Sequence, residues 1–324
     1  SETLGLKTQW SLGSVAGLSD FNTVLVLGGS KFHIDQLNDL DVSPADIARL
    51  DNHEKHRQFS TELRFSGKGD SLFGLGTGIE FVGGLFQFSS NYSLLARILS
   101  GRDLATFATT NDARQLLVPP ELSDLQVLLE QIPTLPGVPG LGDAAALITD
   151  GDYYQFDYLQ DIQSTALFGQ LTWSITDRLS ITPGLRLNRE KKRIDTAGNS
   201  FCNGKEATAA LGLARPCIIE LLLESEDYNL KDLRRKEFDL SPKIALQYFA
   251  DHGINYYTSW TKGAKSGGFN SISFTGEDLE YEAEKARTFE VGAKGQFFKR
   301  RLNINLTLYD TQFDNLQVLA FNGV

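Results

Sequence analysis

Residues 302–309 read Leu-Asn-Ile-Asn-Leu-Thr-Leu-Tyr, in which apolar and polar side chains alternate. Residues 179–188, Leu-Ser-Ile-Thr-Pro-Gly-Leu-Arg-Leu-Asn, follow nearly the same pattern. A period of two places successive side chains on opposite faces of a β-strand. Both stretches therefore predict strands with one apolar and one polar face.

The same alternation recurs along the chain and predicts about ten strands. Their approximate ranges are 2–10, 21–30, 57–66, 76–90, 164–175, 179–192, 237–249, 253–263, 286–297 and 301–314. Most of them approach or exceed ten residues, whereas strands of soluble proteins most often have about five or six. Long strands of this kind are typical of β-barrels that span a membrane.

The connections between these strands are alternately short and long. The short ones fall at 11–20, 67–70, 176–178, 251–253 and 298–301. The long ones fall at about 31–56, 91–163, 193–236 and 264–285. Short turns at one end and long extracellular loops at the other are how outer-membrane barrels are built.

Composition excludes several other classes. With 31 basic and 41 acidic residues the chain carries a net charge of −10, which disfavours binding to nucleic acid. The apolar runs are far shorter than the roughly 18 residues that a membrane helix needs. The region 91–163 holds ten acidic and three basic residues, so it is either a recognition loop or simply a well-solvated one.

Aromatic residues indicate what the apolar face meets. Trp10, Trp173, Tyr248 and Phe297 each belong to the apolar set of their strand and lie just before a short connection. Aromatics at one height predict a girdle at a bilayer interface, although they could also close the core of a soluble sandwich. Strand length and connection order favour lipid. Two prolines, Pro183 and Pro242, count against the strands that contain them, because each lacks a ladder donor.

The remaining motifs do not indicate an enzyme. Ser259 to Lys262 matches S-x-x-K but lies in an alternating strand, and the serine of that motif begins a helix. His53 to His56 is one residue short of H-E-x-x-H. Cys202 and Cys217 are the only cysteines, and we expect a disulfide closing a loop of about 16 residues, worth roughly 3 kcal/mol. Free thiols are the alternative, and no cofactor is expected.

Several of these segments together resemble the barrel of TonB-dependent outer-membrane receptors. About half of the chain carries the resemblance, and Lys-Ser-Gly-Gly-Phe-Asn at 265–270 is its most specific part. The matching segments are 59–64, 176–186, 240–248, 256–270, 284–294 and 301–305. After a strand, Gly267 and Gly268 suit either a close backbone approach or a left-handed turn.

The resemblance implies an all-β fold, a transmembrane antiparallel barrel of 22 strands with a plug domain inside. The chain 1–324 shows about ten strands and no plug, so we expect an incomplete barrel. Either the sequence covers part of a receptor, or the gene product is split.

The resemblance also implies a function. Such a receptor resides in outer-membrane lipid, captures a scarce ligand and releases it inward when the inner-membrane protein TonB acts on the plug. A ferric siderophore is the first expectation; cobalamin, heme or glycans stay open. A passive porin-like channel and a soluble β-sandwich or adhesin-type binding module are the alternatives.

Residues for ligand contact can be named from facing and chemistry. Arg64 and Arg186 have inward parity, as do Glu62, Glu290, Lys294, Asn303 and Asn305. These side chains either contact the ligand or simply hydrate the lumen. Tyr153, Tyr154 and Tyr158 lie near the end of the acidic loop, where amphipathic rings suit ligand capture or packing of the loop on itself.

Overall fold

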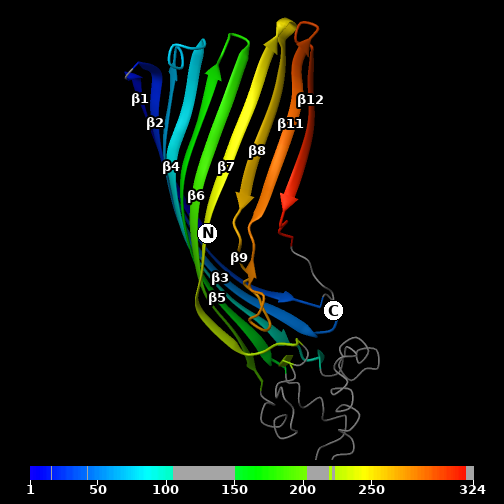
Figure 1. The fold of residues 1–324 in the computed structure, drawn as a ribbon. Helices are drawn as coiled ribbons and strands as arrows, with labels where there is room; N and C mark the ends of the chain where they lie inside the picture. The colour runs from blue at the N-terminus through cyan, green and yellow to red at the C-terminus, as the bar shows by residue number, and fades with distance from the viewer. Residues whose placement is uncertain (16, 42, 105–149, 203–218, 221–222, 319–324) are drawn as a thin grey trace, which may run out of the picture.

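The computed structural model describes residues 1–15, 17–41, 43–104, 150–202, 219–220 and 223–318. These residues form one ten-stranded antiparallel sheet, curved like part of a barrel wall, and one two-stranded hairpin (Figure 1). Neighbours in the large sheet follow the chain, in the order β1-β2-β3-β4-β5-β6-β7-β8-β11-β12. The sheet is not closed, and the described residues form no second large sheet that would make a sandwich. The expectation of an all-β, incomplete antiparallel barrel is confirmed.

The strands of the described residues differ widely in length. In chain order they are β1 (Glu2–Val15), β2 (Leu18–Asp39), β3 (Ala48–Gly69), β4 (Gly78–Ser100), β5 (Tyr153–Ser174), β6 (Leu179–Phe201), β7 (Tyr228–Ala250), β8 (Ile254–Lys265), β9 (Gly268–Phe269), β10 (Glu280–Tyr281), β11 (Glu284–Phe297) and β12 (Leu302–Asp314). A short 3-10 turn, η4 (Asp251–Gly253), joins β7 to β8. No described helix is long and apolar enough to cross a bilayer.

The strands β2 to β7 are much longer than predicted, with 22 or 23 residues each. Three of the five short connections lie where expected. The first is reduced to residues 16–17 because β1 continues to Val15, and the second lies at 70–77 and not at 67–70, because β3 continues to Gly69 and β4 begins at Gly78. The predicted loops 31–56, 91–163 and 193–236 are wrong at both ends, since the flanking strands continue for about ten residues into each of them.

The polarity of the strand faces explains this error. On β6 the outward face carries Leu185 and Leu187 and then changes to Arg189 and Lys191, while the inward face changes from polar residues to buried Ile194. The alternation continues beyond this point, but the outward face becomes polar and the inward face becomes apolar. A search for one apolar face therefore ends at this point, although the strand does not.

The border between the apolar and polar parts of the outward face runs diagonally across the paired rows. On β2 the border lies at Lys31. The residues paired with Lys31 across successive strands form a row that ends at Arg234 on β7. On β12 it lies at Asp310, whose row reaches β7 at Ile244. Ten residues over eight strand-to-strand steps correspond to about 34 Å along the strands and about 38 Å across them. The border is therefore level when the strands are tilted by about 40°, the tilt found in membrane barrels.

The aromatic residues near the short turns follow a parallel line. Followed through the strand pairs, Trp10 on β1 is level with Pro242 on β7, and Trp173 on β5 is level with Leu246. Tyr248 lies on β7 itself. These rows shift in the same direction as the apolar border. On β6 the apolar part of the outward face extends from Leu179 to Leu187, which at this tilt is about 21–23 Å tall and close to the height of the apolar band of such barrels.

Both prolines lie where a ladder stops or is interrupted. In the β6–β7 ladder Pro183 pairs with Ile244, and Pro242 pairs with Leu185, two rows away. Neighbouring rows of an antiparallel ladder alternate in hydrogen bonding, so both prolines fall in rows without bonds and their nitrogens face β5 and β8. The β5–β6 pairing skips the row of Pro183, and the β7–β8 pairing ends one residue before Pro242.

The core lies on the inward face, beyond the apolar border. The connection 266–283, which contains the β9–β10 hairpin, packs there and is not an open loop. The buried cluster comprises Leu94, Ala96, Tyr154, Phe156, Tyr158, Ile194, Phe269 and Leu279. Side chains of β4, β5 and β6 thus gain a dry environment that the open sheet alone does not supply.

The facing of the strands can be tested on β12. Leu306 is outward and 61% exposed, and its neighbour Asn305 faces inward. We expect Leu306→Arg to lower the free energy of unfolding by roughly 2–4 kcal/mol, because it places a charge in hydrocarbon, and Asn305→Arg to have little effect. Urea titration of protein folded into lipid vesicles measures both. Equal effects would reject this facing.

Candidate functional site

The three predicted tyrosines lie on β5 and not in a loop. Tyr154 and Tyr158 are 0% and 2% exposed. The hydroxyl of Tyr154 donates to the carbonyl oxygens of Glu226 (2.6 Å) and Phe274 (3.1 Å). Both rings therefore anchor connecting segments to the sheet, and ligand contact by them stays a prediction.

Tyr153 points to the other face of β5. Its ring stacks on Phe201 with 4.7 Å between centroids, and the Arg97 guanidinium carbon lies 5.2 Å from its centroid. The structure therefore does not bring the three tyrosines together at one site.

The two predicted arginines both face inward but differ in their partners. Arg64 forms an ion pair with Glu62 and donates from Nε to Oε1 at 2.8 Å. Arg186 forms no ion pair with a described residue; its guanidinium carbon lies 5.5 Å from the Phe86 ring centroid and 5.9 Å from that of Phe168. Such a cation–π arrangement leaves N–H groups of Arg186 available to an oxygen acceptor.

Arg186 lines a cavity of about 690 Å³ at the place where β7 and β8 separate. The ladder between these strands ends at the pair Lys243 and Thr261, while β7 continues to Tyr228. The lining residues are Phe86, Phe88, Ser164, Arg186, Asn188, Glu190, Glu237, Phe238, Asp239, Ser241, Gly263, Ala264, Lys265, Ser266, Glu282, Ala283 and Lys285. The volume suits a small-molecule ligand.

One wall of the cavity is held by Arg235. Its guanidinium contacts carboxylate oxygens of Glu237 (2.7 Å), Glu280 (2.6 Å) and Glu282 (2.9 Å). The hydrogen bond from Arg235 lowers the pKa of Glu282 below its usual value. This network ties the connection 266–283 to β7.

The Lys-Ser-Gly-Gly stretch completes that wall. The Ser266 hydroxyl donates to Glu190 at 2.5 Å, and the Gly267 amide donates to Glu237 at 3.1 Å. A Cβ on Gly267 would lie 2.4 Å from the Tyr281 carbonyl oxygen and 2.7 Å from Nη2 of Arg235. The glycine is therefore needed for a close backbone approach, one of the two uses expected from the sequence.

The carboxylates of the cavity are already engaged. Glu190 accepts an ion pair from Lys192 at 3.1 Å, Asp239 accepts a hydrogen bond from Ser241 at 2.5 Å, and Arg235 holds the others. Sequence reasoning missed three inward residues here: Lys192 and Glu237, at the ends of the predicted strands 179–192 and 237–249, and Arg235, which lies in the predicted loop. Arg186 remains as a cation without a carboxylate partner among the described residues, so the cavity offers its charge to an anionic group.

Comparison with known proteins places the chain in a family. The family model described as TonB dependent receptor-like, beta-barrel, matches residues 4–324. This chain belongs to the TonB-dependent receptor family. These receptors are transporters of the outer membrane and not enzymes. Among the described residues, no group of His, Cys, Asp and Glu has a metal-binding arrangement.

Two solved structures share the receptor fold. The ferric yersiniabactin uptake receptor FyuA from Yersinia pestis matches with a TM-score of 0.63 and 14% identity, over 98% of this chain and 36% of that one. The copper transporter OprC matches with a TM-score of 0.53 and 14% identity, over 97% of this chain and 38% of that one. The chain thus spans little more than a third of the length of either protein.

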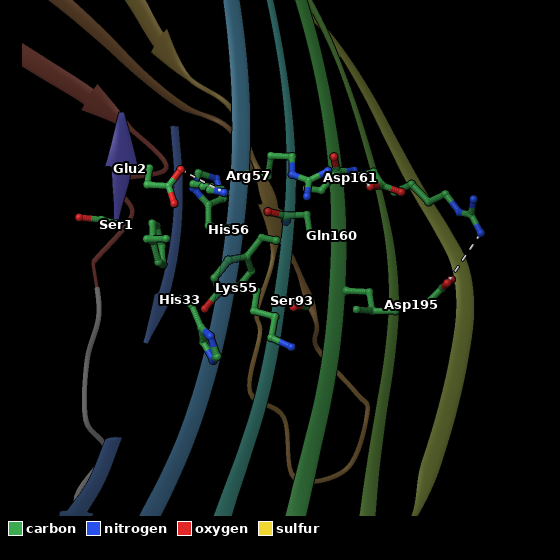
Figure 2. Close-up of a pocket in the computed structure, with 16 residues that line it drawn as sticks. Ser1, Glu2, His33, Lys55, His56, Arg57, Ser93, Gln160, Asp161 and Asp195 are labelled. Atoms are coloured by element: carbon green, nitrogen blue, oxygen red, sulfur yellow. Dashed lines mark hydrogen bonds and ion pairs between the residues drawn. The ribbon is translucent and has the colours of Figure 1, made fainter. Parts of the chain in front are cut away.

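A second hollow of the receptor wall, of about 760 Å³, crosses β1 to β6 and is lined mostly by outward side chains (Figure 2). Lys31 pairs there with Glu2 at 3.1 Å, and Arg193 lies 3.7 Å from Asp195. Because its lining is mostly outward, this hollow lies on the opposite face of the wall from the cavity at Arg186.

The glycine at the centre of the receptor's cavity wall gives a stability test. We expect Gly267→Ala to lower the free energy of unfolding by about 1–3 kcal/mol, because the new Cβ overlaps the Tyr281 carbonyl. Gly263→Ala, on β8, is the matched control, since nothing lies within 4 Å of its added Cβ. Denaturant titration and protease susceptibility of the 266–283 segment measure both; equal behaviour would contradict the close approach.

Proposed function

We propose that this chain forms part of the wall of an outer-membrane receptor that takes up a scarce ligand with energy supplied through TonB. We further propose a ferric siderophore as the ligand. The supporting observation is Arg186, an inward cation without a carboxylate partner among the described residues, in a cavity of about 690 Å³. Iron-chelating ligands present anionic oxygens, which accept charge-assisted hydrogen bonds from a guanidinium.

Placement in a membrane is supported by the outward face. Leu167, Leu185 and Leu306 are 52%, 44% and 61% exposed, although they belong to long regular strands. Hydrocarbon is the environment that makes such exposure favourable. The tilt of about 40° at which the apolar border is level supports the same placement.

The long-connection end is proposed to be extracellular. In the oxidising space outside the inner membrane, a bond between Cys202 and Cys217 would be maintained. Cys217 lies outside the described residues, so the disulfide stays a prediction. A plug and the contact with TonB are likewise proposals that rest on family membership.

The whole proposal can be tested by uptake. In iron-limited cells that lack their other siderophore receptors, the receptor is expected to import iron-55 bound to at least one of a catecholate, a hydroxamate and a carboxylate siderophore. Uptake is expected to stop when TonB is deleted. Uptake that persists without TonB would favour the passive channel instead, and import of copper alone would reject the siderophore.

The cavity itself can be tested with two inward arginines. We expect Arg186→Ala to weaken binding of the imported complex by about 10- to 100-fold, the loss of one hydrogen-bonded charge worth about 1.5–3 kcal/mol. Arg64→Ala should change binding less than about twofold, because Glu62 already neutralises Arg64. Titration of purified receptor by tryptophan fluorescence measures both. An equal loss of affinity in the two variants would reject the assignment of ligand binding to this cavity.

A further inference from the structure

The outward face of β5, β6 and β7 has a hollow of about 350 Å³ where the apolar border crosses these strands. Leu167, Leu187 and Phe238 line its apolar part, and Arg189 and Lys191 line the rest. All five residues have outward parity. The hollow therefore opens on the side opposite to the ligand cavity.

The register of the three strands arranges this hollow in layers. Leu187 pairs with Leu167 and Leu240, which continue the apolar band. Two residues further along β6, Arg189 lies between Thr165 and Phe238. The outward face thus changes from hydrocarbon-facing to cationic side chains within two residues.

The cations at the hollow lack acidic partners. Arg189, Lys191 and Lys236 are exposed and form no ion pair with a described residue. Lys191 lies directly opposite Lys236, and like charges in that position destabilise a sheet. An anion held between them would relieve this repulsion.

In the next outward row a similar pair of like charges has an acidic partner within the protein. Arg193 lies opposite Arg234, and Asp232 contacts both, at 3.0 and 2.7 Å. The row nearer to the apolar band has the same like-charge arrangement without an acid among the described residues. This row, which has no acidic partner among the described residues, lies at the height expected for lipid headgroups.

We propose that this hollow binds an anionic lipid, with the headgroup phosphate between Arg189, Lys191 and Lys236 and an acyl chain along Leu167 and Leu187. The inference rests on the membrane placement proposed above. An apolar floor continuous with the lipid-facing band fits an acyl chain, which a free anion does not have. Three neighbouring cations fit a phosphate, which a neutral lipid does not have.

The test uses the full-length receptor in detergent and two probes that differ in phosphate, diphosphoryl lipid A and its fully dephosphorylated form. Native mass spectrometry should detect the diphosphoryl lipid bound at concentrations at least tenfold lower than the dephosphorylated lipid. Arg189→Gln with Lys191→Gln should abolish this preference. Arg193→Gln with Arg234→Gln, on the same face and already paired with Asp195 and Asp232, is the matched control and should keep it.

The outcomes separate this inference from the proposed function. If the two lipids bind equally, or if both double variants lose the preference equally, the site is wrong. Binding of inorganic phosphate with the same affinity as the lipid would also reject it, because the apolar floor would then contribute nothing. If the receptor does not partition into detergent or vesicles at all, the membrane placement itself fails. Heat-modifiable migration on gels confirms that each variant is folded.

Discussion

Each long strand must match two solvents along its length, and the rest of the structure depends on this constraint. Over about nine residues the outward face of β6 carries Leu, Ile and Pro, and beyond Leu187 it carries Arg and Lys. A strand that passes from hydrocarbon into water must change its outward side chains at that border. The inward face changes in the opposite sense, so the part beyond the border needs an apolar cover, which the segment 266–283 provides.

That cover also creates the cavity at Arg186. Pro242 cannot donate toward β8, and the two strands separate next to it, which opens the sheet between β7 and the returning chain. Arg235 then holds the segment across the gap through three carboxylates. A local loss of ladder bonds is thus compensated by ion pairs between side chains, and the space left between them faces Arg186.

The sequence predicts the parts of the fold that follow one simple period. The ten strands and most of the short turns follow from alternation, and the outward facing of Leu306 follows from alternation taken together with strand length and the order of the connections. The outer halves of β2 to β7 do not, because their faces exchange polarity and the pattern then resembles a polar loop. Gly267 could be singled out by its motif, whereas its partners Lys192 and Arg235 could not, since only the register of β6 and β7 brings them together. The placement of Tyr154 and Tyr158 on a strand escapes prediction, since their part of β5 has the polarity of a loop.

Strand β6 combines these features on opposite faces. Arg186 points inward and Arg189 outward, three residues apart, and each lacks a carboxylate partner among the described residues. Arg193, further along the same strand, is paired with Asp232. The arginines of β6 without an acid therefore lie at the two places where a bound molecule would supply the anion: within the lumen for cargo, and at the lipid border for a headgroup. One alternating strand can serve both because a period of two keeps the two environments apart.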